Sequence, residues 1–228
     1  MARRLLRALL AYPSRSPFTF GFVCLLLLTR LWILYGLPAE QSAAVLAHVS
    51  TNLDNLADHP VSALLGSACF LAGSLTEVTS LGFASTVLTF GLGVCWLLAR
   101  AERRWGGLRA LAVFLGGHVG ATLLTAGVIV VGVRQGWYGE EVRSTLDYGI
   151  SYGSQTVLAA STAALPRRAR PWWALLVLAW PLGGAEWGSG PLPDFTTVGH
   201  LCAALLGFAL LLVRPEVRFR SAAAIAEG

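Results

Sequence analysis

Six apolar stretches, separated by polar segments, dominate the pattern of residues along the chain. They cover residues 18–37, 81–99, 108–133, 149–165, 172–185 and 196–213. A helix needs about 20 predominantly apolar residues to cross about 30 Å of hydrocarbon. The first, third and sixth stretches meet this length best, whereas the fifth is short and contains Pro181. The pattern predicts an all-α, polytopic membrane protein with six transmembrane helices, the first of them retained rather than cleaved as a signal peptide.

Composition supports this class and argues against a nucleic-acid binder. Of the 228 residues, 55% are hydrophobic and 13% are charged, and the mean hydropathy is +0.64. An average soluble domain contains about 25% charged residues. The net charge of +5 rests on 17 arginines and no lysine, and these are spread over the polar segments rather than gathered in one patch. We therefore expect the lipid bilayer, and not nucleic acid, as the surrounding partner.

The distribution of charge predicts the orientation of the chain. Fourteen of the seventeen arginines lie in the two tails and in the connections after the second and fourth stretches, when Arg109 at the start of the third stretch is counted with its connection. The other connections hold two arginines but nine of the twelve acidic residues. Because cytoplasmic segments carry the excess of basic residues, both termini should be cytoplasmic. We expect a basic cytoplasmic tail over residues 1–17, a membrane domain over 18–213 and a second cytoplasmic tail over 214–228.

The longest connection, residues 38–80, is predicted to lie against the membrane on the outer side. It contains an apolar run over residues 61–73 that is too short to span, which is typical of an interfacial or partly re-entrant segment. Its asparagine and aspartate residues are expected to form turns and helix caps. These are Asn52, Asp54, Asn55 and Asp58.

Polar and ionisable groups within the apolar stretches are candidates for function because they are costly in a membrane. Arg30 is expected to reach the interface or to pair with an acid of the outer loop, without a chemical role. His118, in a glycine-rich sequence, is interpreted as a packing histidine that hydrogen-bonds a neighbouring helix. The four cysteines have no metal or redox spacing, so we predict core packing and neither a metal nor a cofactor.

Ser151 and His200 stand apart because the predicted topology gives them a similar depth. Each follows the outer start of its helix, at about 3 Å and 6 Å respectively. A histidine within hydrogen-bond reach activates a serine hydroxyl as a nucleophile, which suggests acyl transfer near the outer membrane surface. The alternatives from the residues alone are a serine cap and a packing histidine. Asp147, four residues before the serine, is expected to be a cap or loop acid.

Several features occur in order along the chain. The membrane-associated outer loop comes first; then follow Glu102-Arg103-Arg104-Trp105-Gly106, Gly149-Ile150-Ser151, and Gly199-His200 with Ala203 and Gly207. This arrangement resembles the rhomboid family of intramembrane serine proteases, over about residues 60–213 and in a six-helix form typical of bacteria. The resemblance implies Ser151 as nucleophile, His200 as general base, and a multi-pass protein of a bacterial plasma membrane. Its partners would be transmembrane proteins, as substrates or clients.

The spacing of small residues in the last stretch has its own physical meaning. Gly199, Ala203 and Gly207 lie four residues apart, and small residues at this spacing allow two helices to approach closely. We therefore predict that they pack the sixth helix against a neighbour and bring His200 toward the fourth. Glu102, with the arginines that follow it, is expected to have a structural role.

The chain departs from the family around the dyad. Thr86 and Phe90 stand where active rhomboids carry the histidine and asparagine of the oxyanion hole. Each lost donor typically costs about 100- to 1,000-fold in rate unless another group replaces it. Tyr152 follows the serine in place of glycine, and Gln155 stands where the family often has an aromatic residue. Gly149, Thr86 and Gln155 are the candidates for oxyanion binding or support of the site.

Three function classes therefore stay open: a divergent rhomboid-type peptidase, a catalytically inactive relative that binds or escorts transmembrane segments, and a small transporter. The transporter hypothesis has little support, since the chain lacks a line of ionisable residues along a pore. Other intramembrane proteases fit poorly. The metalloprotease sequence His-Glu-x-x-His is absent, and an aspartyl protease is disfavoured because no apolar stretch holds an aspartate. A prenyl-processing enzyme would have a Glu-Glu pair before a Phe-x-x-x-His sequence. Here Phe114 and His118 have that spacing, but Glu140-Glu141 comes after them.

Overall fold

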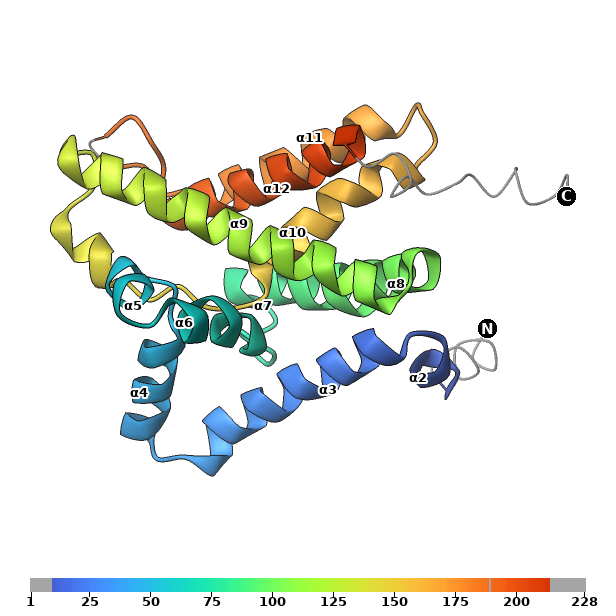
Figure 1. Cartoon of the computed structure of the whole chain (residues 1–228), viewed down its shortest axis with the longest axis horizontal. Coiled ribbons are helices and arrows are strands. Elements are labelled where there is room, and N and C mark those ends of the chain that lie inside the picture. The colour runs from blue at the N-terminus through green and yellow to red at the C-terminus, as the bar shows by residue number, and fades with distance from the viewer. Residues whose placement is uncertain (1–9, 189, 214–228) are drawn as a thin grey trace, which may run out of the picture.

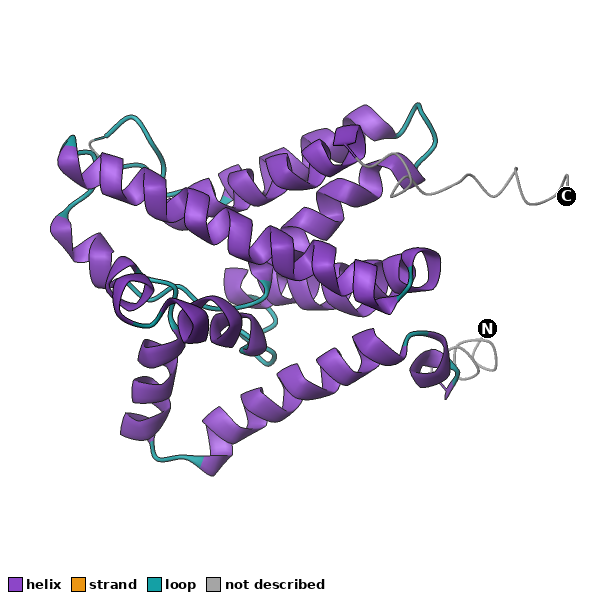
Figure 2. Cartoon of the chain, viewed as in Figure 1, coloured by secondary structure: helices purple, strands orange, loops and turns teal. Residues whose placement is uncertain are grey.

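The computed structural model describes residues 10–188 and 190–213. Helices form the architecture throughout this part of the chain, as Figures 1 and 2 show. The described residues contain no strand, and one isolated β-bridge joins Trp187 to Pro193. The all-α prediction is therefore confirmed. Most of the tail over residues 1–17 and all of the tail over 214–228 lie outside the described residues.

Each of the six predicted apolar stretches is helical. The corresponding segments are α3 (Pro17–Leu31) with η1 (Trp32–Gly36); α7 (Leu81–Thr86) with η3 (Val87–Leu98) and α8 (Ala99–Trp105); α9 (Gly107–Arg134); α10 (Ser151–Ala160) with η5 (Ser161–Ala164); α11 (Arg170–Gly183); and α12 (Phe195–Val213). Among the described residues, four segments are long and apolar enough to cross a membrane: Pro17–Gly36, Leu81–Trp105, Gly107–Arg134 and Phe195–Leu212. By contrast, α10 has 10 residues and α11 has 14.

Helix α10 lies in the centre of the bundle, which explains why it is short and moderately polar. All its residues from Tyr152 to Ala160 are buried, and it contacts η3, α9, α11 and α12 (Figure 1). Glycines on the neighbouring helices allow close approach: Gly93 faces Ser154, and Gly117 faces Thr156. A helix surrounded by protein does not need the apolar surface or the length that lipid demands.

Three consecutive side chains of α10 each donate a hydrogen bond to a backbone carbonyl of a different helix. The pairs are Ser154 with Thr89 of η3 (2.9 Å), Gln155 with Val177 of α11 (2.6 Å), and Thr156 with Ala203 of α12 (3.0 Å). Successive residues of an α-helix point about 100° apart, so three adjacent positions reach three neighbours. These bonds fix α10 within the bundle on three sides.

The outer connection folds into short helices instead of an extended loop. They are α4 (Ala39–Val49), α5 (Leu53–Asp58), α6 (Pro60–Gly66) and η2 (Ser67–Cys69). The apolar part, Pro60–Cys69, has 10 residues, which is too short to span, as the sequence predicts. The Asn52 side chain accepts a hydrogen bond from the N–H of Asn55 (2.9 Å) and caps α5.

Helix α3 holds the end of this connection through two polar side chains. The Arg30 guanidinium donates to the carbonyls of Leu71 (3.3 Å) and Gly73 (3.0 Å). The Thr29 hydroxyl donates to the Cys69 carbonyl (2.7 Å). Arg30 thus bonds the backbone of the outer connection, where the sequence suggested an acidic partner or the interface.

At its other end, α3 is capped by a carboxylate from α8. The Glu102 side chain accepts hydrogen bonds from the N–H groups of Phe18 (2.9 Å) and Thr19 (2.7 Å), and from the Thr19 hydroxyl (2.6 Å). A negative group at a helix N-terminus is favourable because the unpaired N–H groups and the helix dipole point at it. Glu102 is only 6% exposed, so these bonds replace its water shell.

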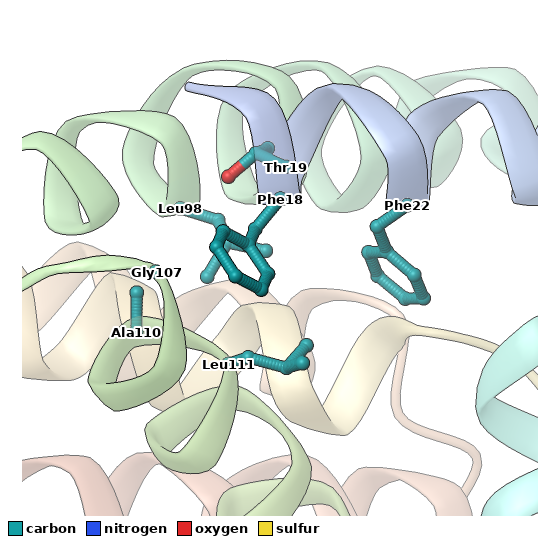
Figure 3. A pocket seen from close by; sticks show the side chains of 7 residues that line it. All are labelled: Phe18, Thr19, Phe22, Leu98, Gly107, Ala110 and Leu111. Atoms are coloured by element: carbon teal, nitrogen blue, oxygen red, sulfur yellow. The ribbon is translucent and has the colours of Figure 1, made fainter. Parts of the chain in front are cut away.

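A small pocket lies beside this cap, between α3, η3 and α9. Figure 3 shows the rings of Phe18 and Phe22 extending from α3 toward α9. The lining residues are Phe18, Thr19, Phe22, Leu98, Gly107, Ala110 and Leu111. Gly107 is required here, because a Cβ at this position would overlap the Phe18 ring. The pocket is almost entirely apolar and belongs to the packing of α3.

Candidate active site

Ser151 is the first residue of α10, and the turn before it depends on a glycine. Gly149 has a φ of +126°, in the left-handed region that favours glycine. Its N–H donates to the carbonyl of Ser67 in η2 (3.0 Å), and a Cβ on Gly149 would lie 3.2 Å from that of Ala72. The outer connection therefore packs directly against the turn that delivers Ser151 to the start of the helix.

The first turn of α10 carries backbone donors without helical partners. The first helical hydrogen bond runs from the Ser154 N–H to the Ile150 carbonyl (3.0 Å). The N–H groups of Ser151, Tyr152 and Gly153 precede it, and none makes a hydrogen bond within the described part of the chain. Unpaired N–H groups at a helix N-terminus attract negative charge. Backbone donors of this kind are able to stabilise an oxyanion in acyl transfer.

His200 lies in α12 and is held in one tautomer. Its Nδ1 is 2.7 Å from the carbonyl oxygen of Thr196. A carbonyl only accepts hydrogen bonds, so Nδ1 carries the proton and donates. The second ring nitrogen, Nε2, consequently keeps its lone pair and is able to accept a proton.

Asp194 fixes the start of α12, the helix that carries His200. Its carboxylate accepts hydrogen bonds from the Thr197 N–H (3.0 Å) and the Thr197 hydroxyl (2.8 Å). Burial alone would raise the pKa of Asp194, but hydrogen bonds from Thr196, Thr197 and the Glu186 N–H together lower it. The ionised cap defines where the helix that carries His200 begins.

Tyr152, the residue after the serine, joins the two halves of the site. Its ring meets the His200 ring edge to face, with centroids 5.0 Å apart and planes at 80°. A Cβ on Gly199 would overlap the end of the Tyr152 ring, so this glycine makes the contact possible. From the sequence alone, Tyr152 stands out only as a departure from the family pattern. Hydrophobic periodicity does not reveal which side chains of different helices contact each other.

Ser151 and His200 are both half-buried, at the ends of helices that pack against each other. Although Tyr152 touches His200, no hydrogen bond joins Ser151 to His200 in the residues that the structure describes. Catalytic hydrogen bonds are often long in enzymes without substrate and tighten in the complex. The arrangement brings the two groups to one end of the bundle without closing the bond between them.

The second-helix candidates have other partners. The Thr86 hydroxyl donates its proton toward the carbonyls of Gly82 (2.8 Å) and Ala72 (3.4 Å), and Phe90 packs against the main core. Ala72 also packs against Gly149, so Thr86 supports the turn before Ser151 indirectly, through Ala72. An oxyanion role for Thr86 stays a prediction.

Gln155 satisfies a carbonyl that a proline leaves without a partner. Its amide donates to the Val177 carbonyl of α11 (2.6 Å). In a regular helix this carbonyl would accept from the N–H four residues on, but that residue is Pro181, which has none. Gln155 therefore ties α10 to α11 where α11 is internally weakest.

Gln155→Ala is expected to lower the free energy of unfolding by about 1–3 kcal/mol, because the Val177 carbonyl is left unpaired. In a Pro181→Ala background the loss should shrink, since the restored N–H at position 181 pairs with that carbonyl. Thermal or denaturant unfolding in detergent would measure the coupling. Pro171→Ala is the matched control, because Pro171 lies at the start of α11. If Gln155→Ala lowered the free energy of unfolding equally in the wild-type, Pro181→Ala and Pro171→Ala proteins, this account would be contradicted.

The three small residues of α12 all lie against α10. Gly199 faces Tyr152, the Ala203 carbonyl accepts from Thr156, and Gly207 faces the backbone of Thr156. A Cβ on Gly207 would overlap the Thr156 carbonyl oxygen and lie 2.7 Å from the Cβ of Ala159. Backbone atoms have no rotamer to adopt, so a larger residue at position 207 must separate the helices.

Gly207→Ala is accordingly expected to destabilise the protein by about 1–3 kcal/mol, measured as unfolding in detergent. Gly116→Ala in α9 is a suitable comparison, because a Cβ there meets nothing within 4 Å. That change should leave stability equal or raise it by about 0.5–1 kcal/mol, since alanine is favoured over glycine in a helix. Equal stability of the two variants would refute close packing at Gly207.

A second serine–histidine pair lies deeper in the protein. His118 Nε2 is 2.9 Å from the Ser67 hydroxyl, and the two residues are 1% and 0% exposed. The pair ties η2 to α9, so the partner of His118 belongs to the outer connection. Full burial separates this pair from Ser151 and His200, which are both partly exposed.

The segment before Ser151 is bound to the outer connection at several points. The Thr51 N–H donates to the Asp147 carbonyl (2.7 Å), and the Asp147 N–H donates to the Ser50 hydroxyl (2.8 Å). The Asn52 amide donates to the Ser144 carbonyl (3.3 Å). Burial raises the pKa of Asp147 to about 6. Its carboxylate accepts a hydrogen bond from the Tyr152 hydroxyl (3.0 Å).

Among the described residues, no group of three or more His, Cys, Asp or Glu side chains forms a candidate metal site. The chemistry available here is that of a hydroxyl, an imidazole and backbone donors.

Comparison with known proteins gives one match. Residues 11–223 match the family described as rhomboid-like protein. No curated protein and no solved structure matches the chain. The match extends over nearly the whole sequence and confirms the resemblance that the motifs predicted.

Proposed function

Because the chain belongs to the rhomboid-like family and is an integral multi-pass membrane protein, we propose that it is an intramembrane serine endopeptidase. Ser151 acts as the nucleophile and His200 as the general base. The substrates are transmembrane proteins, cut near the outer membrane face. The proposed setting is a bacterial plasma membrane, with six spans and both termini in the cytoplasm.

One observation carries this proposal: His200 is locked with Nδ1 as donor to Thr196, which leaves Nε2 free as a base beside the start of α10. In the proposed reaction, Nε2 takes the Ser151 proton while the serine oxygen attacks the substrate carbonyl. The N–H groups of the first turn of α10 stabilise the oxyanion. The imidazolium then protonates the leaving amine, and a water molecule, deprotonated by His200, releases the acyl group.

These backbone donors compensate for the missing second-helix groups. Thr86 and Phe90 leave the site without the side-chain donors of active rhomboids. The Ser151, Tyr152 and Gly153 N–H groups are unpaired and fixed by the helix, so they need no reorganisation when charge develops. Their number and position support an active site that relies on the backbone.

A second candidate function is a catalytically inactive rhomboid-like protein that binds or escorts transmembrane segments. The lack of a hydrogen bond between Ser151 and His200 in the described structure favours it, as does the engagement of Thr86 with two carbonyls. In that case the polar pair would serve packing alone, and the protein would recognise helices without cleaving them.

Reaction of the detergent-purified protein with a fluorescent fluorophosphonate separates these functions. A peptidase should be labelled on Ser151 and should cleave a reporter transmembrane segment that has small and polar residues near its outer end. A protein that binds the reporter but shows neither labelling nor cleavage would overturn the peptidase proposal and support the binder. Labelling of the Ser151→Cys variant by an impermeant thiol reagent from the cytoplasmic side would overturn the proposed orientation.

A further inference from the structure

The side chains of Asp147 and Tyr152 form a connected pair beside His200, and the proposed reaction uses neither of these side chains. We propose that Asp147 is a positioning residue for His200, acting through the Tyr152 ring. This inference rests on the proposed peptidase function and deepens it. Asp147 touches neither substrate nor nucleophile in this role, since its effect passes through Tyr152.

The contacts run without a gap from the carboxylate to the imidazole. The Tyr152 hydroxyl donates to Asp147 Oδ2 (3.0 Å), and the Tyr152 ring meets the His200 ring at 5.0 Å and 80°. Gly199 leaves the space that the end of the Tyr152 ring fills. The hydroxyl end of the tyrosine is thus fixed by Asp147, and its ring lies against the imidazole.

Three hydrogen bonds hold the backbone of Asp147 to one segment of the outer connection. Its N–H donates to the Ser50 hydroxyl (2.8 Å), and its carbonyl accepts from the Thr51 N–H (2.7 Å) and the Thr51 hydroxyl (2.9 Å). These bonds come from the segment between α4 and α5. The outer connection therefore determines where the carboxylate stands.

The physical effect is a second restraint on His200. The bond from Nδ1 to Thr196 fixes one edge of the imidazole but allows rotation about that bond. The Tyr152 ring, packed edge to face, restricts this rotation, and the Asp147 bond restricts the tilt of the tyrosine. Together they hold Nε2 in one direction, which matters because catalytic groups must be aligned closely with the reacting atoms.

Ionisation of Asp147 makes the restraint sensitive to pH. With a pKa of about 6, Asp147 is charged at neutral pH and accepts a charge-assisted hydrogen bond, and it becomes neutral below that pH. The titratable group that α10 places against the Asp147 carboxylate is Tyr152. The charge of Asp194, which precedes α12, acts electrostatically on Tyr152. The contribution of Asp147 should therefore be present above about pH 6 and fade below it.

The test compares Asp147→Asn, Tyr152→Phe and the double variant by the rate of fluorophosphonate labelling of Ser151 between pH 5 and 8. Each single change should slow labelling at pH 7.5 by about five- to tenfold, which is within the range of one ordinary net hydrogen bond. The double variant should be no slower than the singles. The ratio of the wild-type rate to the Tyr152→Phe rate should fall toward one as the pH drops through about 6. This ratio cancels the titration of His200 itself.

Asp54→Asn is the matched control, because Asp54 is an exposed acid of α5 whose Oδ1 lies 3.9 Å from Arg143 Nε. It should change the rate less than twofold. Unfolding in detergent shows whether each variant is folded. If Asp147→Asn does not fold, Tyr152→Phe still tests the proposal, because it removes the hydroxyl that bonds Asp147 and keeps the aromatic ring. Additive effects in the double variant, or a wild-type to Tyr152→Phe ratio that does not change with pH, would overturn the positioning role.

A readout without activity separates this inference from the function on which it rests. The imidazole NMR signals of His200 should shift in both Asp147→Asn and Tyr152→Phe, and not in Asp54→Asn. If wild-type protein is not labelled at all, the peptidase proposal fails, and the His200 signals alone decide whether Asp147 orients the ring. Unchanged His200 signals in both variants would overturn the inference.

Discussion

Ser151→Ala is expected to abolish fluorophosphonate labelling and reporter cleavage, and His200→Ala to reduce both by about 10,000-fold or more. The serine oxygen forms the covalent bond, so nothing replaces it. Without His200 the hydroxyl keeps its proton and is a poor nucleophile at neutral pH. Gel fluorescence over time gives the labelling rate, and mass spectrometry of the labelled peptide identifies the modified residue.

Two serines of the same protein serve as controls. Ser154 lies one turn further along α10, with its hydroxyl bonded to the Thr89 carbonyl, so Ser154→Ala should lower stability but keep labelling. Ser67 is paired with His118 at 2.9 Å. Labelling that survives Ser151→Ala and disappears in Ser67→Ala would assign the nucleophile to the buried pair and contradict the proposed site.

Glu102→Ala should cause the largest loss of stability among the changes considered, about 3–5 kcal/mol. Three hydrogen bonds to the carboxylate disappear, which leaves the part-buried N–H of Phe18 and the buried N–H of Thr19 without an acceptor. Each buried donor left unsatisfied costs about 1–3 kcal/mol, and hydrogen bonds to a charged group lie at the upper end of the range. Unfolding by denaturant or heat in detergent measures the loss.

Glu102→Gln is the informative comparison. Its amide keeps one oxygen acceptor, so the loss should be smaller than for alanine. Glu77→Ala removes an acid on the exposed outer connection and should change stability by less than about 0.5 kcal/mol. A Glu102→Ala protein as stable as Glu77→Ala would show that the cap contributes nothing to the fold.

The positions of the helices follow from the apolar runs, because burial in lipid or protein demands the same side chains along a whole helix. Residues 149–165 show where this inference weakens. The sequence indicates a transmembrane span. In the structure, α10 and η5 end at Ala164 and together have fewer residues than a helix needs to cross lipid, and α10 is surrounded by other helices. Hydropathy does not distinguish a helix buried in lipid from one buried among other helices.

The sequence indicates Ser151 and His200 as site candidates, and these stay predictions, whereas the side chains that surround them carry no such signal. The equal depth of Ser151 and His200 follows from helix starts, and the glycine spacing in α12 follows from close packing. By contrast, Tyr152 and Gln155 looked like departures from a family pattern, and Asp147 looked like a loop acid. Their partners lie on other helices, at His200, Val177 and the outer connection. A single sequence carries no signal for such pairs.

The bonds between the outer connection and the segment before α10 join residues 92 to 97 positions apart. Contacts of such long range form slowly, because the entropy of closing a long loop must be paid before the contact repays it. During synthesis the α4–α6 region leaves the ribosome well before Ser144 and Asp147, and α12 follows last. These bonds must therefore wait until the segment before the fourth helix has been synthesised, and His200 arrives after that. For a peptidase, this order of biogenesis keeps the nucleophile apart from its base until translation of the membrane domain is nearly complete.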